Sequence, residues 1–275
     1  MVDTIAALLK RLRVDYRTRW ELMRLRARVH NMPRYTPGRL SVMGWDLEYV
    51  DGLALVSCIE VLVLKGWNNF IPATAEPVIL DCGANIGISV LNYKRQYPKA
   101  KIIAFEPDPQ IAPVLRRNLE VNSARDVRVI EAAVWTGAGE ADLFCEGADG
   151  SKLISRHECK SNSVTVATVN LADFISEGTD LIKMDIEGAE FHVVPALGER
   201  LRAVRNMIIE CHVNNDEVAP FGQLLQGLAS AGFNVSINSF GAWRDLVRQP
   251  EKLPNTFDQY FLVVAWHDHQ EPAAS

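Results

Sequence analysis

The sequence predicts an α/β fold in which a mostly parallel, Rossmann-like sheet is covered by helices on both faces. After Pro77, short apolar runs alternate with helix-like segments, and these runs are residues 78–81, 101–105, 127–133, 181–185 and 207–211. Strands that are apolar throughout are typical of parallel sheets buried on both faces. The first run also leads into a glycine-containing turn that opens a helix, as in nucleotide-binding sheets.

The last part of the chain adds two further strands. Residues 233–237 and 260–266 are apolar runs separated by a loop rich in Asn, Gly and Pro, so we expect them to close one edge of the sheet. Between residues 136 and 169 the helical pattern fails. Residues 141–145 and 163–168 predict a β excursion around a polar loop at 146–162.

Residues 4–30 predict a basic amphipathic helix, because apolar side chains recur every three to four positions with arginines between them. These apolar residues are Leu8, Leu9, Leu12, Tyr16, Trp20, Met23 and Val29. Strands at 40–43 and 45–49 and a helix over 57–66 follow. We expect residues 1–54 to form an extension that acts as a lid or joins a homodimer, in front of a domain at 55–275. Docking of the helix on an anionic membrane surface is an alternative.

The charge distribution argues against nucleic acid as the main partner. The net charge is −5, and residues 1–34 hold nine Lys/Arg against three Asp/Glu, so the remaining chain is strongly acidic. The chain has no apolar run near the ~18 residues of a transmembrane helix and no signal-peptide pattern, which predicts a cytoplasmic protein. Its five scattered cysteines form no Cys-x-x-Cys pair, which favours reduced thiols over disulfides or structural zinc.

The strongest motif joins the first strand to the first helix of the sheet. Gly83 allows a ligand to approach the backbone closely, and Gly87 allows tight packing of the helix. Asn85 stands where a dinucleotide fingerprint has its middle glycine, which makes room for a pyrophosphate. With Asp81 at the strand tip and Ala84 in the turn, this pattern favours a ligand with a cationic amino-acid end. S-adenosylmethionine is such a ligand.

Acidic side chains follow two more strands. Glu106, next to Pro107, lies 25 residues after Asp81, near the ~20-residue offset at which a carboxylate binds ribose hydroxyls in such sheets. Asp185 ends another strand and is a candidate to orient the substrate, hold the methionine amine or bind a divalent metal such as Mg²⁺. Glu187 and Glu190 fit the first turn of a helix, where the dipole favours them.

His212 ends the next strand and is a candidate general base, because histidine titrates near neutral pH. Glu210 is placed to orient it or to share a metal with Asp185.

Three segments together resemble the FkbM family of S-adenosylmethionine-dependent methyltransferases: Asp81-Cys-Gly-Ala-Asn-Ile-Gly87, Phe105-Glu-Pro107 and Lys183-Met-Asp-Ile-Glu-Gly-Ala-Glu190. The resemblance covers about residues 55–265. It implies a class I methyltransferase fold with a seven-stranded sheet and transfer of a methyl group to a hydroxyl of a sugar, glycan or natural product. By position, it implies that Gly83, Asn85 and Gly87 line the cofactor turn, Glu106 holds the ribose, and Ala132 and Ala133 border the adenine.

Other functions stay open at this point. A carbon or nitrogen acceptor on a small metabolite is an alternative, with Trp67, Trp135 or Trp243 stabilising cationic charge. An NAD-dependent enzyme conflicts with the missing middle glycine. A non-catalytic module that binds the cofactor or a partner is a further alternative.

Overall fold

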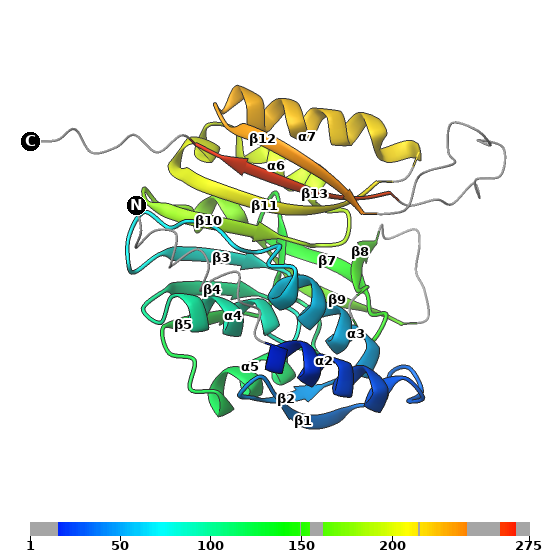
Figure 1. Ribbon diagram of the computed structural model, residues 1–275. Helices are drawn as coiled ribbons and strands as arrows, with labels where there is room; N and C mark the ends of the chain where they lie inside the picture. Colours follow the sequence, from blue (N-terminus) through cyan, green and yellow to red (C-terminus); the bar gives the residue numbers. More distant parts are fainter. Residues whose placement is uncertain (1–15, 149, 155–161, 214, 241–258, 268–275) are drawn as a thin grey trace, which may run out of the picture.

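A seven-stranded sheet forms the centre of the fold. The computed structural model describes residues 16–148, 150–154, 162–213, 215–240 and 259–267. The strands are β3 (Val78–Cys82), β4 (Lys101–Phe105), β5 (Val127–Ile130), β10 (Thr179–Met184), β11 (Val204–Val213), β12 (Asn234–Phe240) and β13 (Gln259–Trp266). Their order is β12-β13-β11-β10-β3-β4-β5, and only β13 is antiparallel to its neighbours. The predicted α/β fold is confirmed, and β12 and β13 close one edge of the sheet as expected (Figure 1).

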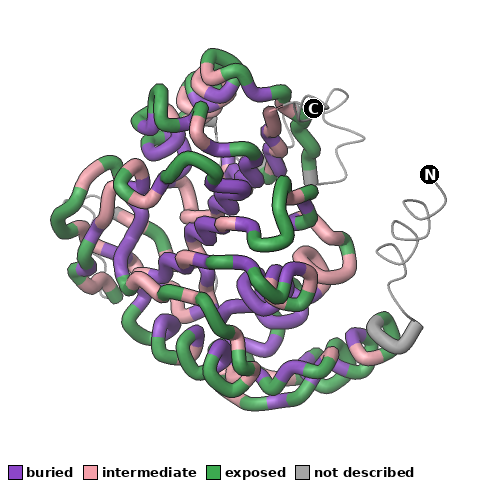
Figure 2. The backbone as a smooth tube through the Cα atoms, turned by 90° about the vertical axis from the view of Figure 1, so that its left-hand side faces the viewer, coloured by how far each residue is buried: buried purple, intermediate pink, exposed green. Residues whose placement is uncertain are grey.

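Helices cover both faces of this sheet. Successive side chains of a strand point to opposite faces, so apolar strands present a surface for packing on each face. Ile79 and Leu181 pack into one hydrophobic core, whereas their neighbours Leu80 and Ile182 pack into another. The first core includes α2 (Tyr16–Val29), α3 (Gly52–Cys58), α4 (Ile88–Gln96) and α5 (Ala112–Val121), and the second includes α6 (Glu190–Leu197) and α7 (Val218–Ser230). Figure 2 shows the buried segments at the centre of the molecule, with exposed segments around them. Short 3₁₀ turns occur at η2 (Leu171–Asp173), η3 (Gly198–Ala203) and η4 (Asn215–Glu217).

A second, four-stranded sheet corrects two predictions. It has the order β6-β9-β7-β8, with β6 (Ala133–Trp135), β7 (Gly139–Phe144), β8 (Lys152–Ile154) and β9 (Ser163–Asn170). The run at 127–133 is not one strand, because β5 ends at Ile130 and the chain enters the second sheet at Ala133. Glu131 lies at this break, between the apolar residues Ile130 and Ala132. The loop at 146–162 contains β8, which is too short for a periodic pattern; its residues 155–161 lie outside the described part of the chain.

The N-terminal extension packs on the domain. Leu22, Leu25 and Val29 of α2 are buried, whereas Trp20 and Met23 are 51% and 59% exposed. The predicted apolar stripe was therefore wrong at these two positions, because the domain contacts a different side of the helix. Residues 4–15 of the predicted helix lie outside the described residues.

Between α2 and the main sheet, β1 (Gly38–Val42) and β2 (Trp45–Tyr49) form a hairpin. α3 begins earlier than the predicted residue 57, because the Asp51 carboxylate accepts hydrogen bonds from the backbone N–H groups of Leu53 and Ala54, each at 2.9 Å. It continues as a π-helix, η1 (Ile59–Leu64). The expected boundary between residues 54 and 55 thus falls within α3. The lid and dimer roles stay predictions.

In the described residues, no helix combines the length and the apolar character needed to cross a bilayer. The four described cysteines, Cys58, Cys82, Cys145 and Cys211, are free thiols. This agrees with the prediction of reduced cysteines, while Cys159 lies outside the described residues.

Candidate functional site

Two adjoining pockets lie at the carboxyl ends of β3, β4, β10 and β11, where ligands bind in open parallel sheets. They share three lining residues, Cys58, Asp185 and Glu187. The first pocket is also lined by the expected cofactor residues Gly83, Asn85, Glu106, Pro107, Ala132 and Ala133. The second is lined by His212 and Glu210, together with Arg34 of the N-terminal extension. The sheet therefore brings the predicted motifs together.

The turn after β3 requires glycine at its first position. Gly83 has a φ of +79°, and a Cβ built on it would lie 1.8 Å from the backbone oxygen of Asp185. Gly87 has a φ of +94° and precedes α4, and a Cβ there would lie 2.8 Å from a methyl carbon of Leu115. Gly83 thus lets β3 and β10 approach closely, while Gly87 and Ala84 lie outside the pocket lining and serve the packing of the turn.

Asn85 fills the space of the missing middle glycine. Its backbone is left-handed, with a φ of 47°, and its side-chain amide donates a 3.0 Å hydrogen bond to the backbone oxygen of Ala148. The loop containing Ala148 is thereby tied to the turn after β3.

Glu106 has oxygen atoms positioned for a diol. Its carboxylate accepts hydrogen bonds from the backbone N–H groups of Asn85, at 2.8 Å, and Asp108, at 2.9 Å, one on each oxygen. Each oxygen keeps a second lone pair, and the residue lines the first pocket. Burial raises the pKa of Glu106 to about 7, although the two backbone hydrogen bonds lower it.

The other end of the first pocket is apolar. Ala132 and Ala133 are buried at the crossing from β5 to β6. Around them the lining consists of Phe105, Ile111, Val134, Leu143 and Leu153. The lining of the first pocket therefore combines apolar side chains with carboxylates.

Asp81 corrects a sequence expectation. Its side chain is buried between sheet and helix, where the Ser89 hydroxyl donates a hydrogen bond to it and Lys183 Nζ lies 3.6 Å away. It does not line either pocket. The alternation of side chains along β3 directs Asp81 toward Ser89 of α4 and Lys183, away from the pocket lining.

Lys183 is a site residue that the sequence analysis did not single out. Its ammonium donates a 2.7 Å hydrogen bond to the backbone oxygen of Gly83 and lies 3.5 Å from the Asp185 carboxylate. Although burial lowers the pKa of Lys183, Asp185 and Asp81 raise it above its ordinary value. A lysine within an apolar strand was the available signal, because a buried ammonium requires partners.

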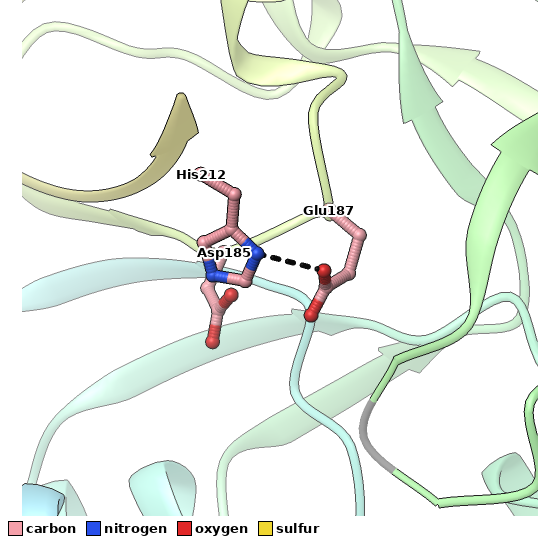
Figure 3. Close-up of side chains that lie close together, drawn as sticks. All are labelled: Asp185, Glu187 and His212. Atoms are coloured by element: carbon pink, nitrogen blue, oxygen red, sulfur yellow. Dashed lines mark ion pairs between the residues drawn. The ribbon is translucent and has the colours of Figure 1, made fainter. Parts of the chain in front are cut away.

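Asp185, Glu187 and His212 converge in the second pocket (Figure 3). His212 Nδ1 lies 3.0 Å from Glu187 Oε2, and Nε2 lies 3.4 Å from Glu210 Oε1. Burial lowers the pKa of His212, but hydrogen bonds to Glu187 and Glu210 outweigh it and raise the pKa to about 11. The ring of Tyr260 packs edge-on against the imidazole, and the two ring centroids are 4.6 Å apart. The imidazole is therefore protonated at neutral pH while Glu187 contacts it.

Glu190 shapes the loop that carries Glu187. It is buried, and its carboxylate accepts hydrogen bonds from the backbone N–H groups of Ile186 and Gly188, at 2.5 and 2.8 Å. Burial raises its pKa to about 7. Glu190, the first residue of α6, thus holds the loop that precedes the helix, and Glu187 is directed toward His212 with a left-handed φ of 56°.

Residues 146–148, 150 and 151 connect the two pockets to the N-terminal extension. The Tyr35 hydroxyl donates a hydrogen bond to Glu146, and the Ser151 hydroxyl donates one of 2.8 Å to Asp108. Arg34, which lines the second pocket, binds Asp51 at 2.7 Å. Sequence analysis could not pair these residues, because Tyr35 and Glu146 are 111 positions apart.

Known proteins resemble parts of this chain in sequence. It is 32% identical to Methyltransferase sdnD of Sordaria araneosa over 50% of this chain and 66% of that protein. It is 26% identical to Methyltransferase 1 of Beauveria bassiana over 70% of this chain and 82% of that protein. It is 30% identical to 2-O-methyltransferase NoeI of Sinorhizobium fredii over 49% of this chain and 63% of that protein. The chain thus spans slightly less than two thirds of the length of the first and third relatives.

Residues 81–235 match the family described as Methyltransferase FkbM domain. The matched segment contains the turn after β3, Glu106, Lys183, Asp185 and His212. Because this segment is more than half of the sequence, the chain belongs to the FkbM methyltransferase domain family.

Proposed function

We propose that this methyltransferase transfers a methyl group from S-adenosylmethionine to a hydroxyl group of a sugar, glycan or natural product. The observation that carries the proposal is that the two pockets meet at Asp185 and Glu187. A cofactor in the first pocket and an acceptor in the second would contact each other at this junction.

The residues of the first pocket fit S-adenosylmethionine. The Glu106 oxygens suit the ribose diol, the lining around Ala132 and Ala133 suits the adenine, and Asp185 suits the amino group of the methionine end. When bound, the cofactor supplies a methyl group on a positively charged sulfur. The Asn85 side chain lies where a pyrophosphate would need space, which counts against NAD.

The second pocket fits a polar acceptor. Ionisable side chains dominate its lining: Arg34, Glu146, Lys152, Asp185, Glu187, Glu210, His212 and Glu217. The name of NoeI, a 2-O-methyltransferase, supports an oxygen acceptor. Trp67 and Trp135 do not line either pocket, and Trp243 lies outside the described residues. Within the described lining, a carbon acceptor therefore has no support from Trp67 or Trp135.

His212 and Asp185 are the proposed catalytic residues. Alignment of the acceptor oxygen with the methyl group can lower the barrier by ~7–11 kcal/mol, against a factor of ~10²–10⁴ from a general base. Asp185 positions the acceptor hydroxyl. An acceptor that displaces Glu187 from Nδ1 removes the hydrogen bond that raises the pKa of His212 most, so the imidazole can then take the hydroxyl proton.

Replacement of Glu106 by alanine tests the cofactor assignment. We expect S-adenosylhomocysteine to bind the wild-type protein in calorimetry and to bind Glu106→Ala at least tenfold more weakly, about 1.4 kcal/mol. NAD should not bind either protein. Glu120→Ala, at an exposed position of α5, is the matched control and should bind like the wild type. Binding of NAD, or of neither compound to the wild type, would reject the proposal and leave the non-catalytic alternative.

Replacement of His212 by alanine tests the base. With an acceptor found by screening hexuronic acids, neutral sugars and hydroxylated natural products, we expect kcat to fall ~10²–10⁴-fold. In Glu187→Gln the acidic limb of the pH–rate profile, where the rate rises as the base loses its proton, should move to lower pH, because the hydrogen bond that raises the pKa of His212 is weakened. The exposed His30→Ala is the control. Unchanged turnover in His212→Ala would exclude the base role.

A further inference from the structure

We propose that Asp185, Glu187 and His212 form a binding site for a divalent transition-metal cation, with Mn²⁺ as the representative ion. The inference rests on the proposed function only for the role of the cation, which would face the acceptor in the second pocket. The ligand set itself depends on the geometry of the three side chains (Figure 3).

The separations between the donor atoms match a coordination sphere. Each residue offers one ligand atom, and these atoms all lie within 4.8 Å of one another. His212 Nδ1 and Glu187 Oε2 are 3.0 Å apart. Metal bonds of ~2.1 Å at right angles place two neighbouring ligands about 3.0 Å apart, so a cation can bridge these two atoms with little movement.

Surrounding groups hold each donor in place, which is the usual support of a metal site. Glu210 binds the second nitrogen of His212, at 3.4 Å. The Lys183 ammonium binds the Asp185 carboxylate, at 3.5 Å. Glu190 binds the backbone on either side of Glu187. All three donors are therefore oriented before any cation arrives.

The donor types favour Mn²⁺ over Mg²⁺, the ion that the sequence left as one possibility at Asp185. Mg²⁺ prefers oxygen ligands and keeps several waters, whereas imidazole nitrogen suits transition metals. Two carboxylates and one imidazole match a cation that accepts both donor types. Glu210 and Glu217, which line the same pocket, add negative charge. A cation here would lower the pKa of a hydroxyl that contacts it.

Cation binding and the base role of His212 exclude each other, because both need the lone pair of Nδ1. The methyl-transfer proposal does not depend on which of the two uses applies. A measurement of metal binding therefore distinguishes the two proposed functions of His212, which are cation ligand and general base.

The test is a titration of the full-length, chelator-treated protein with Mn²⁺, followed by electron paramagnetic resonance and calorimetry. We expect one saturable site, weakened at least tenfold in Glu187→Gln and in His212→Ala. Glu199→Gln removes a charge at an exposed position that lines neither pocket and should bind Mn²⁺ within about twofold of the wild type. Mg²⁺ should bind at least tenfold more weakly than Mn²⁺.

Three results would overturn the inference: no saturable Mn²⁺ binding, equal binding by the two donor variants and the wild type, or a preference for Mg²⁺. Each variant is first tested for binding of S-adenosylhomocysteine, which shows that it is folded. If S-adenosylhomocysteine binds and Mn²⁺ does not, the metal site is wrong and the methyltransferase proposal stands. If Mn²⁺ binds and S-adenosylhomocysteine does not, the metal site stands and the methyltransferase proposal is wrong.

Discussion

Gly83→Ala should abolish binding of S-adenosylhomocysteine and destabilise the fold. The left-handed backbone alone costs about 1–2 kcal/mol for a residue with a Cβ. The new Cβ would also lie 1.8 Å from the Asp185 backbone oxygen, and a main-chain atom cannot rotate away. β3 and β10 would have to separate at the point where the backbone N–H of Asp185 donates a 3.1 Å hydrogen bond to Cys82. Calorimetric binding and chemical denaturation measure the two effects.

Gly222→Ala provides the matched control for this change. Gly222 is exposed on α7, and a Cβ there meets no atom within 4 Å. Alanine inside a helix should stabilise the protein by about 0.5–1 kcal/mol, the opposite sign, with cofactor binding unchanged. A Gly83→Ala variant with wild-type stability and affinity would show that the close approach of β3 and β10 is not required.

The sequence predicted the parts of this site whose signal is local. An apolar strand followed by a glycine turn identifies Gly83 as a candidate. Polar residues at strand ends identify Glu106, Asp185 and His212. Parallel strands bring such ends to one edge, so the grouping followed from the fold class. The roles of these residues remain proposals.

Interactions between distant segments were beyond the sequence pattern. The inward direction of Asp81 depends on the partners Ser89 and Lys183, and the change of sheet before Ala133 is marked in the sequence only by Glu131. The contact of Tyr35 with Glu146 exists only after the extension folds onto the domain. The packed side of α2 likewise depends on what it meets, as the exposed Trp20 illustrates.

Lys183→Met should be the most destabilising single change among the charged residues of the site. Lys183 and Asp81 are buried, with side chains 7% and 0% exposed and charged atoms 3.6 Å apart. Removing one member of a buried ion pair costs about 3–5 kcal/mol, because the remaining charge has lost its partner. The backbone oxygen of Gly83 also loses its 2.7 Å hydrogen bond. The free energy of unfolding from denaturant titration measures this loss, and Lys101→Met, at a surface position on β4, should change it by less than about 0.5 kcal/mol.

The double variant Lys183→Met/Asp81→Asn separates the role of Lys183 in stability from its role in the site. Neutralising Asp81 removes the uncompensated buried charge, so the double variant should recover part of the lost stability. It should not recover binding of S-adenosylhomocysteine, because neither methionine nor asparagine at these positions restores the hold on Gly83 and Asp185. Recovery of both properties together would mean that Lys183 only balances the charge of Asp81. Recovery of stability alone would mean that Lys183 positions the turn and the carboxylate at which the two pockets meet.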